Sequence, residues 1–280
     1  MTAFVVVWVH PPIATRMARA GATEWLRMAP LPGKVGHNVV FRLMTSVEAG
    51  ALAGAGGGGR IRVGLIETIR ARGGDGGGRL PWLGRHLERL HSSAAALGLT
   101  PPPSELGDLI RMSVGSRDRV VRVELRDGSA EIATRDISDE RSLSVIVSHE
   151  IHQPYPHKTT RREPFGRALS RARREGASDA ILVTAAGFVA EGTAWNLFWW
   201  DNGALCTPAA DLGILPGVGR HRVMELTPVR EEQVPPAALN GHSLFVVNSV
   251  RGIVEIATFE GSRCRADPRT AELSASFWPD

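Results

Sequence analysis

Four short apolar segments lie between residues 179 and 208, and they constrain the fold more than any other part of the chain. The segments are DAILVT, FVAEG, WNLFWW and ALCTP, and turn signals such as AAG and DNG separate them. Short runs rich in β-branched and aromatic residues, bounded by glycine and small polar residues, are typical of antiparallel strands. The sequence therefore predicts a strand-rich body in this half of the chain.

Helical patterns accompany these strands. After Pro81, apolar residues recur at helical spacing, at Leu83, Leu87, Leu90, Ala94 and Leu97. Further helices are expected in TPPPSELGDLIRM, in EPFGRALSRARREG, which Gly176 closes, and in LPGVGRHRVMEL.

Additional strands are expected in RIRVGLIETIRA, LSVIVS and SLFVVNSVRGIVEI, and a hairpin is expected to turn at Asp127-Gly128. This mixture of antiparallel strands and helices indicates an α+β fold in two lobes. The N-terminal lobe is expected to be small and α/β, and the larger C-terminal lobe to hold mixed strands and helices.

The length of 280 residues allows one large or two modest domains. We expect residues 60–148 to form the small domain and residues 158–280 the large one. The proline-containing segment 149–157 is expected to link them. Residues 1–59 stay unassigned, because they end in AGALAGAGGGG, which is typical of a flexible linker.

Composition excludes several classes of protein. The net charge is +4, but the arginines are scattered and no basic run is interleaved with aromatic residues, so no nucleic-acid partner is expected. No apolar run approaches the roughly 18 residues of a membrane span. The two cysteines, Cys206 and Cys264, form no CxxC pair, so neither a disulfide framework nor a metal site is predicted, and a cytoplasmic location fits best.

Lysine is nearly absent from the chain. Among 33 lysines and arginines, only Lys34 and Lys158 are lysines. Arginine stays protonated, whereas a lysine amine can lose its proton and form a Schiff base. Lys158 is therefore a candidate for chemistry, although composition alone also fits a surface lysine.

An aldehyde cofactor such as pyridoxal 5'-phosphate needs an acid at its ring nitrogen and donors for its phosphate. Glu191 has apolar neighbours in EGTAWNLF, and a carboxylate is unusual there unless it has a partner. A glutamate that faces water at the end of a strand would also fit this pattern. In LPGVGR, the backbone N–H groups of Val218 and Gly219 begin a predicted helix and could bind phosphate. This signal is weak alone, since many helices begin after Pro-Gly.

Taken in order, the motifs HKTTRR, EGTAWNLF, ILPGVGR and VVNSVRGIVEI resemble those of the class IV (fold type IV) pyridoxal-phosphate enzymes. That family includes branched-chain and D-amino-acid aminotransferases and aminodeoxychorismate lyase. The segment RHLERLHSSA resembles a helix of the same family's small domain. The resemblance covers about residues 60 to 260, and it implies a homodimer.

The resemblance also implies roles for particular residues. Lys158 would be the Schiff-base lysine and proton shuttle, Glu191 would pair with the pyridine nitrogen, and Asn196 would support the cofactor. The phosphate would be held by Arg89, Val218, Gly219 and Ser249.

The chain departs from the family pattern at three places. Arg161-Arg162 replaces a common Asn-Arg or Asn-Tyr pair, and Gly219 replaces a phosphate-binding threonine or serine, for which Ser249 could compensate. An aspartate-arginine and tyrosine-glycine motif typical of the N-terminal strand is missing from residues 1–59, which puts substrate enclosure in doubt.

The core motifs fit a lyase and a transaminase equally, because both begin with imine exchange and proton abstraction. Thr68, where branched-chain aminotransferases usually have glycine, and the similarity of HKTTRR to the lyase favour 4-amino-4-deoxychorismate lyase, an enzyme of folate biosynthesis that forms 4-aminobenzoate and pyruvate. A branched-chain or D-amino-acid transaminase and an inactive interaction module are the alternatives.

A small anionic amino substrate would suit nearby arginines, because guanidinium groups bind carboxylates through two hydrogen bonds. In so arginine-rich a chain, however, most arginines are surface charges. The candidate substrate-binding residues are Thr68, Arg70, Arg161, Arg162 and Arg251.

Overall fold

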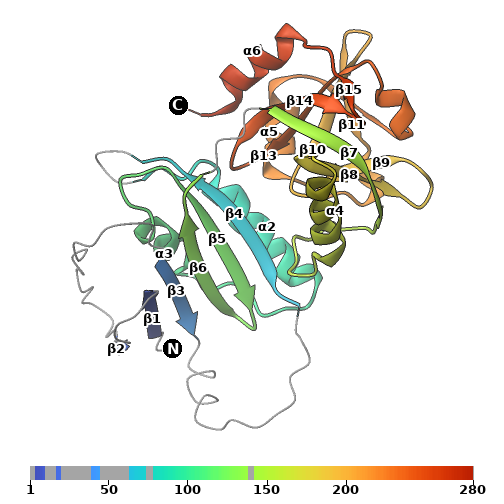
Figure 1. Ribbon diagram of the computed structural model, residues 1–280. Helices are drawn as coiled ribbons and strands as arrows, with labels where there is room; N and C mark the ends of the chain where they lie inside the picture. The colour runs from blue at the N-terminus through green and yellow to red at the C-terminus, as the bar shows by residue number, and fades with distance from the viewer. Residues whose placement is uncertain are drawn as a thin grey trace. The chain divides into compact units, whose positions relative to one another are not determined.

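The computed structural model describes residues 63–73, 78–137 and 142–279, together with the backbone of three strands before residue 63 (Figure 1). The chain divides into two compact units, Met1–Ile137 and Ser138–Asp280. Each unit has its own sheet and its own hydrophobic core.

The first unit is built on a six-stranded antiparallel sheet in the order β2-β1-β3-β6-β5-β4. Its strands are β1 (Phe4–Val9), β2 (Met17–Arg19), β3 (Val39–Met44), β4 (Leu65–Ala71), β5 (Arg119–Arg126) and β6 (Ser129–Arg135). The first three lie within residues 1–59, for which the sequence indicated no strand, and the pairing of β3 with β6 adds them to the sheet. The predicted linker before residue 60 lies outside the described residues.

The helices and the hairpin of the first unit follow the predicted pattern. Helix α2 (Leu83–Ala96) packs against β4, and the short helix α3 (Leu106–Met112) follows it. At the hairpin, Asp127 and Gly128 have φ values of 49° and 79°, as a two-residue turn of type I′ requires. Leu97 is the exception to the predicted apolar stripe, because it follows the helix and is 42% exposed.

A nine-stranded mixed sheet forms the second unit. Its strands are β7 (Ser142–His152), β8 (Asp179–Thr184), β9 (Val189–Gly192), β10 (Asn196–Asp201), β11 (Ala204–Pro208), β12 (Val229–Glu232), β13 (Ser243–Asn248), β14 (Gly252–Phe259) and β15 (Ser262–Arg263). Strand β9 pairs with both β8 and β10, so β10, β13, β14, β7, β8 and β9 close into a ring. The pair that closes this ring is Glu191 opposite Asn196.

Strand β7 differs from the expected domain organisation. The sequence assigned its first part to the small domain and residues 149–157 to a linker, but β7 continues to His152. It pairs in parallel with β8 and β14, and therefore belongs to the second unit. Such parallel pairing joins segments far apart in the chain, so a local pattern cannot reveal it.

Helices accompany the second sheet (Figure 1). Helix α4 (Glu163–Arg174) packs on β7 and β8 and is followed by Gly176 at φ 79°, as predicted. Helix α5 (Val218–Leu226) packs on β13 and on α6 (Pro268–Phe277), which also packs on β14. Two 3₁₀ turns, Ala210–Leu212 and Pro236–Leu239, complete the unit. No helix in the described part of the chain is long and apolar enough to cross a membrane.

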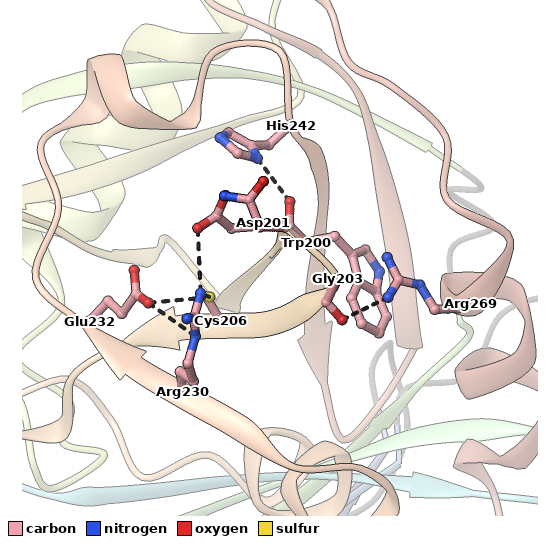
Figure 2. A network of polar contacts seen from close by, with 9 residues as sticks. Trp200, Asp201, Gly203, Cys206, Arg230, Glu232, His242 and Arg269 are labelled. Carbon is pink, nitrogen blue, oxygen red and sulfur yellow. Dashed lines mark hydrogen bonds and ion pairs between the residues drawn. The ribbon is translucent and has the colours of Figure 1, made fainter.

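Polar contacts fasten the edge strand β12 to β11 and β10 (Figure 2). On β12, Arg230 lies 3.4 Å from the Asp201 carboxylate and 3.3 Å from that of Glu232. The same guanidinium donates to the Cys206 sulfur at 3.5 Å. Burial raises the pKa of the Cys206 thiol, so this cysteine belongs to the packing of the edge.

Candidate active site

Lys158 lies in the half-buried loop between β7 and α4. Tyr155 holds this loop at two points: its backbone N–H donates to the Gly213 carbonyl at 2.7 Å, and its hydroxyl donates to the Thr159 carbonyl at 2.6 Å. Gly213 has a φ of 74°, and a Cβ there would lie 2.9 Å from the Cα of Pro154. Only glycine permits both this conformation and this approach.

Glu191 is a buried carboxylate on β9, 4% exposed. Its Oε1 accepts hydrogen bonds from His152 Nε2 at 3.0 Å and from the Leu215 backbone N–H at 3.2 Å. No described residue hydrogen-bonds to Oε2, and no described lysine or arginine pairs with the carboxylate. Burying an anion without a cation is costly, so this arrangement suits a cationic N–H group brought by a ligand.

His152 was not predicted from the sequence, because it lies in a segment that has no clear period. Its side chain is fully buried, its ring meets Phe165 edge to face, and Nδ1 has no hydrogen-bond partner among the described residues. We assign the tautomer with its proton on Nε2, since a second buried N–H at Nδ1 would have no acceptor. In that tautomer the Nε2–H group of His152 donates to Glu191 and orients its carboxylate.

Asn196 supports the loop that leads into α5. Opposite Glu191 in the ring, its Nδ2 donates to the Leu215 carbonyl at 3.0 Å. A Cβ on Gly217 would lie 2.0 Å from Asn196 Oδ1, so the loop passes closely over this side chain. Asn196 and Glu191 thus both contact Leu215, one at its carbonyl and the other at its N–H.

Helix α5 begins at Val218, and its first turn lies against the end of β13. The N–H of His221 bonds to the Gly217 carbonyl, so the preceding amides come before the first intrahelical bond and are available to an anion. A Cβ on Gly219 would lie 2.8 Å from the carbonyl carbon of Asn248. This close approach explains the glycine, because a serine or threonine would displace the helix from the turn that carries Ser249.

These residues fit pyridoxal phosphate. The buried carboxylate lacks a cation, the lysine is carried by a held loop, and the glycine-lined helix start lies beside a serine, which are the features that this cofactor requires. The second unit carries six of the predicted residues: Lys158, Glu191, Asn196, Val218, Gly219 and Ser249.

Arg89, the remaining predicted phosphate ligand, lies on α2 in the first unit. It donates to Glu67 through Nε at 2.8 Å and Nη2 at 2.6 Å, and His86 Nδ1 lies 2.6 Å from the same carboxylate. Burial raises the pKa of Glu67, but Arg89 and His86 outweigh burial and lower the pKa to about 2. Glu67 alternates along the strand with the core residues Leu65 and Ile69, and a charged residue at such a position could have revealed this cluster in the sequence.

The other predicted substrate residues have varied surroundings. Thr68 and Arg70 alternate with Glu67 on β4, so they project from the opposite face of the sheet, and Arg70 pairs with Asp118. In the second unit, Arg161 is exposed and Arg162 half-buried. The Arg251 guanidinium lies 5.5 Å from the centre of the Trp195 ring.

The α+β fold and the residues described above fit an enzyme that uses pyridoxal phosphate. Residues 64–259 match the family model described as Amino-transferase class IV, and the chain belongs to this family of pyridoxal-phosphate-dependent enzymes. The family expected from the sequence is thus confirmed.

Two relatives illustrate the range of the family. A Schizosaccharomyces pombe protein named aminodeoxychorismate lyase is 26% identical over 192 residues, covering 63% of this chain and 83% of the relative. A Thermotoga maritima protein named branched-chain-amino-acid aminotransferase is 34% identical over 119 residues, covering 39% of this chain and 44% of the relative.

Solved structures of branched-chain aminotransferases share the fold. The enzyme of Thermoproteus uzoniensis with norvaline has a TM-score of 0.70 at 21% identity, covering 98% of this chain and 93% of that structure. The pyridoxal-phosphate form of the Thermobaculum terrenum enzyme has a TM-score of 0.68 at 21% identity, covering 76% and 83%. These similarities confirm the expected α+β fold.

Proposed function

We propose that this chain binds pyridoxal phosphate, with Lys158 as the lysine that joins the cofactor and Glu191 as the partner of its ring nitrogen. The observation that carries the proposal is the buried Glu191 carboxylate, with which no described lysine or arginine pairs. A protonated pyridine ring would supply the missing positive charge. Family membership and the cofactor named for the Thermobaculum terrenum structure support the same assignment.

The bound cofactor would supply an electron sink for the substrate carbon. Glu191 would keep a proton on the ring nitrogen through Oε2, while its Oε1 stays fixed by His152 and Leu215. Lys158 would take a proton from the substrate at Nζ and return it, as a positioned amine can when it is deprotonated.

In the second unit, the phosphate would be held by the start of α5 and by Ser249. Arg89 in the first unit stays a prediction as a phosphate ligand. Glu67 would orient Arg89 through the two hydrogen bonds between them. The enzyme is expected to act as a cytoplasmic homodimer.

The reaction that we propose is the conversion of 4-amino-4-deoxychorismate to 4-aminobenzoate and pyruvate. The Schizosaccharomyces pombe relative, matched over 83% of its length, supports this choice. The second candidate is an amino-acid transaminase, which the more identical but shorter match to the Thermotoga maritima protein favours.

Absorbance and product assays test the proposal in sequence. Purified chain with added pyridoxal phosphate should gain a visible band, and borohydride should then fix the cofactor on Lys158. Incubation with 4-amino-4-deoxychorismate should release 4-aminobenzoate and pyruvate. Amino-group transfer from L-leucine or D-alanine to 2-oxoglutarate without those products would instead establish the transaminase. No band, with no effect of Lys158→Ala, would establish an interaction module.

A further inference from the structure

We infer that Arg162 is a positioning residue that fastens the Lys158 loop to the turn that follows Glu191. The inference rests on the proposed function of those two residues. It concerns one member of the Arg161-Arg162 pair, which replaces a common family pattern. The two side chains differ, because Arg161 is exposed whereas Arg162 is half-buried and occupied by contacts on several sides.

The first contact reaches the turn after β9. The Arg162 Nη2 group donates to the backbone carbonyl of Thr193, two residues beyond Glu191. Two further hydrogen bonds hold that turn: the Thr193 N–H donates to the buried carboxylate of Asp179 at 3.1 Å, and the Gly192 N–H donates to the Trp195 carbonyl at 2.9 Å. A displacement of Thr193 would therefore also displace β9, the strand that carries Glu191.

A second group of contacts reaches Tyr155 in the Lys158 loop and Phe165 in the first turn of α4. The Arg162 guanidinium carbon lies 4.8 Å from the centre of the Phe165 ring and 5.7 Å from that of Tyr155. Nη1 lies 3.5 Å from the Tyr155 hydroxyl, which donates to the carbonyl of Thr159, the residue after Lys158. Both rings are buried, so the guanidinium is held against a fixed surface.

Arginine is suited to this place by its shape as well as its charge. A planar guanidinium can donate in its plane to a carbonyl while its faces lie on aromatic rings. A lysine ammonium offers one compact charge and cannot make both kinds of contact at once. The geometry therefore predicts that Lys cannot replace Arg162, although the charge would be retained.

Hydrogen exchange of the chain without cofactor tests this link directly. In Arg162→Met, amide exchange should rise roughly tenfold in residues 155–160 and 192–196, because both segments lose a shared contact. Arg162→Lys should behave in the same way. Arg173→Met is the matched control, since Arg173 is an exposed arginine near the other end of α4 without a described partner, and it should leave both segments unchanged.

Cofactor binding gives a second measurement. Arg162→Met should fix pyridoxal phosphate on Lys158 roughly tenfold more slowly, because the loop and Glu191 no longer keep their spacing. In Arg162→Ala, millimolar methylguanidine should restore part of the rate by occupying the vacated space.

The inference would be overturned if Arg162→Lys showed wild-type amide exchange in both segments. It would also be overturned if protection from exchange fell in only one of the two segments. Failure of the wild-type chain to bind pyridoxal phosphate would overturn the proposed function and leave the exchange test of Arg162 intact.

Discussion

His152 Nε2 lies 3.0 Å from Glu191 Oε1, and both side chains are buried. We expect His152→Leu to lower the free energy of unfolding by about 2 kcal/mol, because a buried carboxylate loses one of its two donors. It should also shift the visible band of the bound cofactor, since Glu191 can then move. His152→Gln, which keeps an N–H donor, should retain much of both properties. Equal denaturant midpoints and spectra for His152→Leu and the wild type would contradict this role.

Glu191→Gln should affect stability and activity in opposite directions. The glutamine oxygen can accept both bonds that Oε1 accepts, while the cost of burying an unneutralised charge disappears. The chain without cofactor should therefore be as stable as the wild type or more stable, by about 1 kcal/mol, in urea unfolding. Turnover should fall by about a hundredfold or more, because an amide cannot hold a proton on a pyridine nitrogen. A marked loss of stability without loss of turnover would show that Glu191 serves the fold alone.

Local patterns in the sequence predicted most elements correctly, and the reason is physical. Helix α2 and the hairpin at Asp127-Gly128 depend on neighbours within a few residues, so periodicity and turn chemistry suffice. The parallel pairings of β7 with β8 and β14 depend on residues far apart in the chain, and no local pattern contains them.

The candidate site shows the same division. Residue type alone made candidates of Lys158, Glu191 and the glycines before α5, and the resemblance to a known family strengthened these predictions. His152 and Glu67 act through partners that are distant in sequence, so their roles required the structure. Arg162 was expected to bind substrate, which stays a prediction, and its contacts with Tyr155 and Phe165 required the structure.

Acid should destabilise the first unit through Glu67. Its pKa is lowered to about 2 in the folded chain, below the usual value of 4.5, so its stabilising contribution is complete above pH 4.5 and is lost as the pH falls toward 2. Glu67→Gln should remove a contribution on the order of 3 kcal/mol at neutral pH. It should also flatten the fall in stability between neutral and acidic pH.

The control for Glu67 is Glu88→Gln, which changes an exposed glutamate on α2 that has no described partner. Urea unfolding at several pH values, followed by circular dichroism, measures both variants. An acid dependence of Glu67→Gln identical to that of the wild type would exclude Glu67 as its source.

Gly219→Ser tests whether the family's usual phosphate-binding hydroxyl can be restored in this chain. The added Cβ would lie 2.8 Å from the Asn248 carbonyl carbon, and a backbone atom cannot yield as a flexible side chain can. We therefore expect the substitution to cost about 1–3 kcal/mol of stability and to weaken pyridoxal-phosphate binding, although it adds a donor. Gly166→Ala on α4, where a Cβ would meet nothing within 4 Å, should be neutral or stabilising. Calorimetric melting and cofactor titration of both variants measure the outcome, and tighter binding by Gly219→Ser would show that the start of α5 can move away from Asn248.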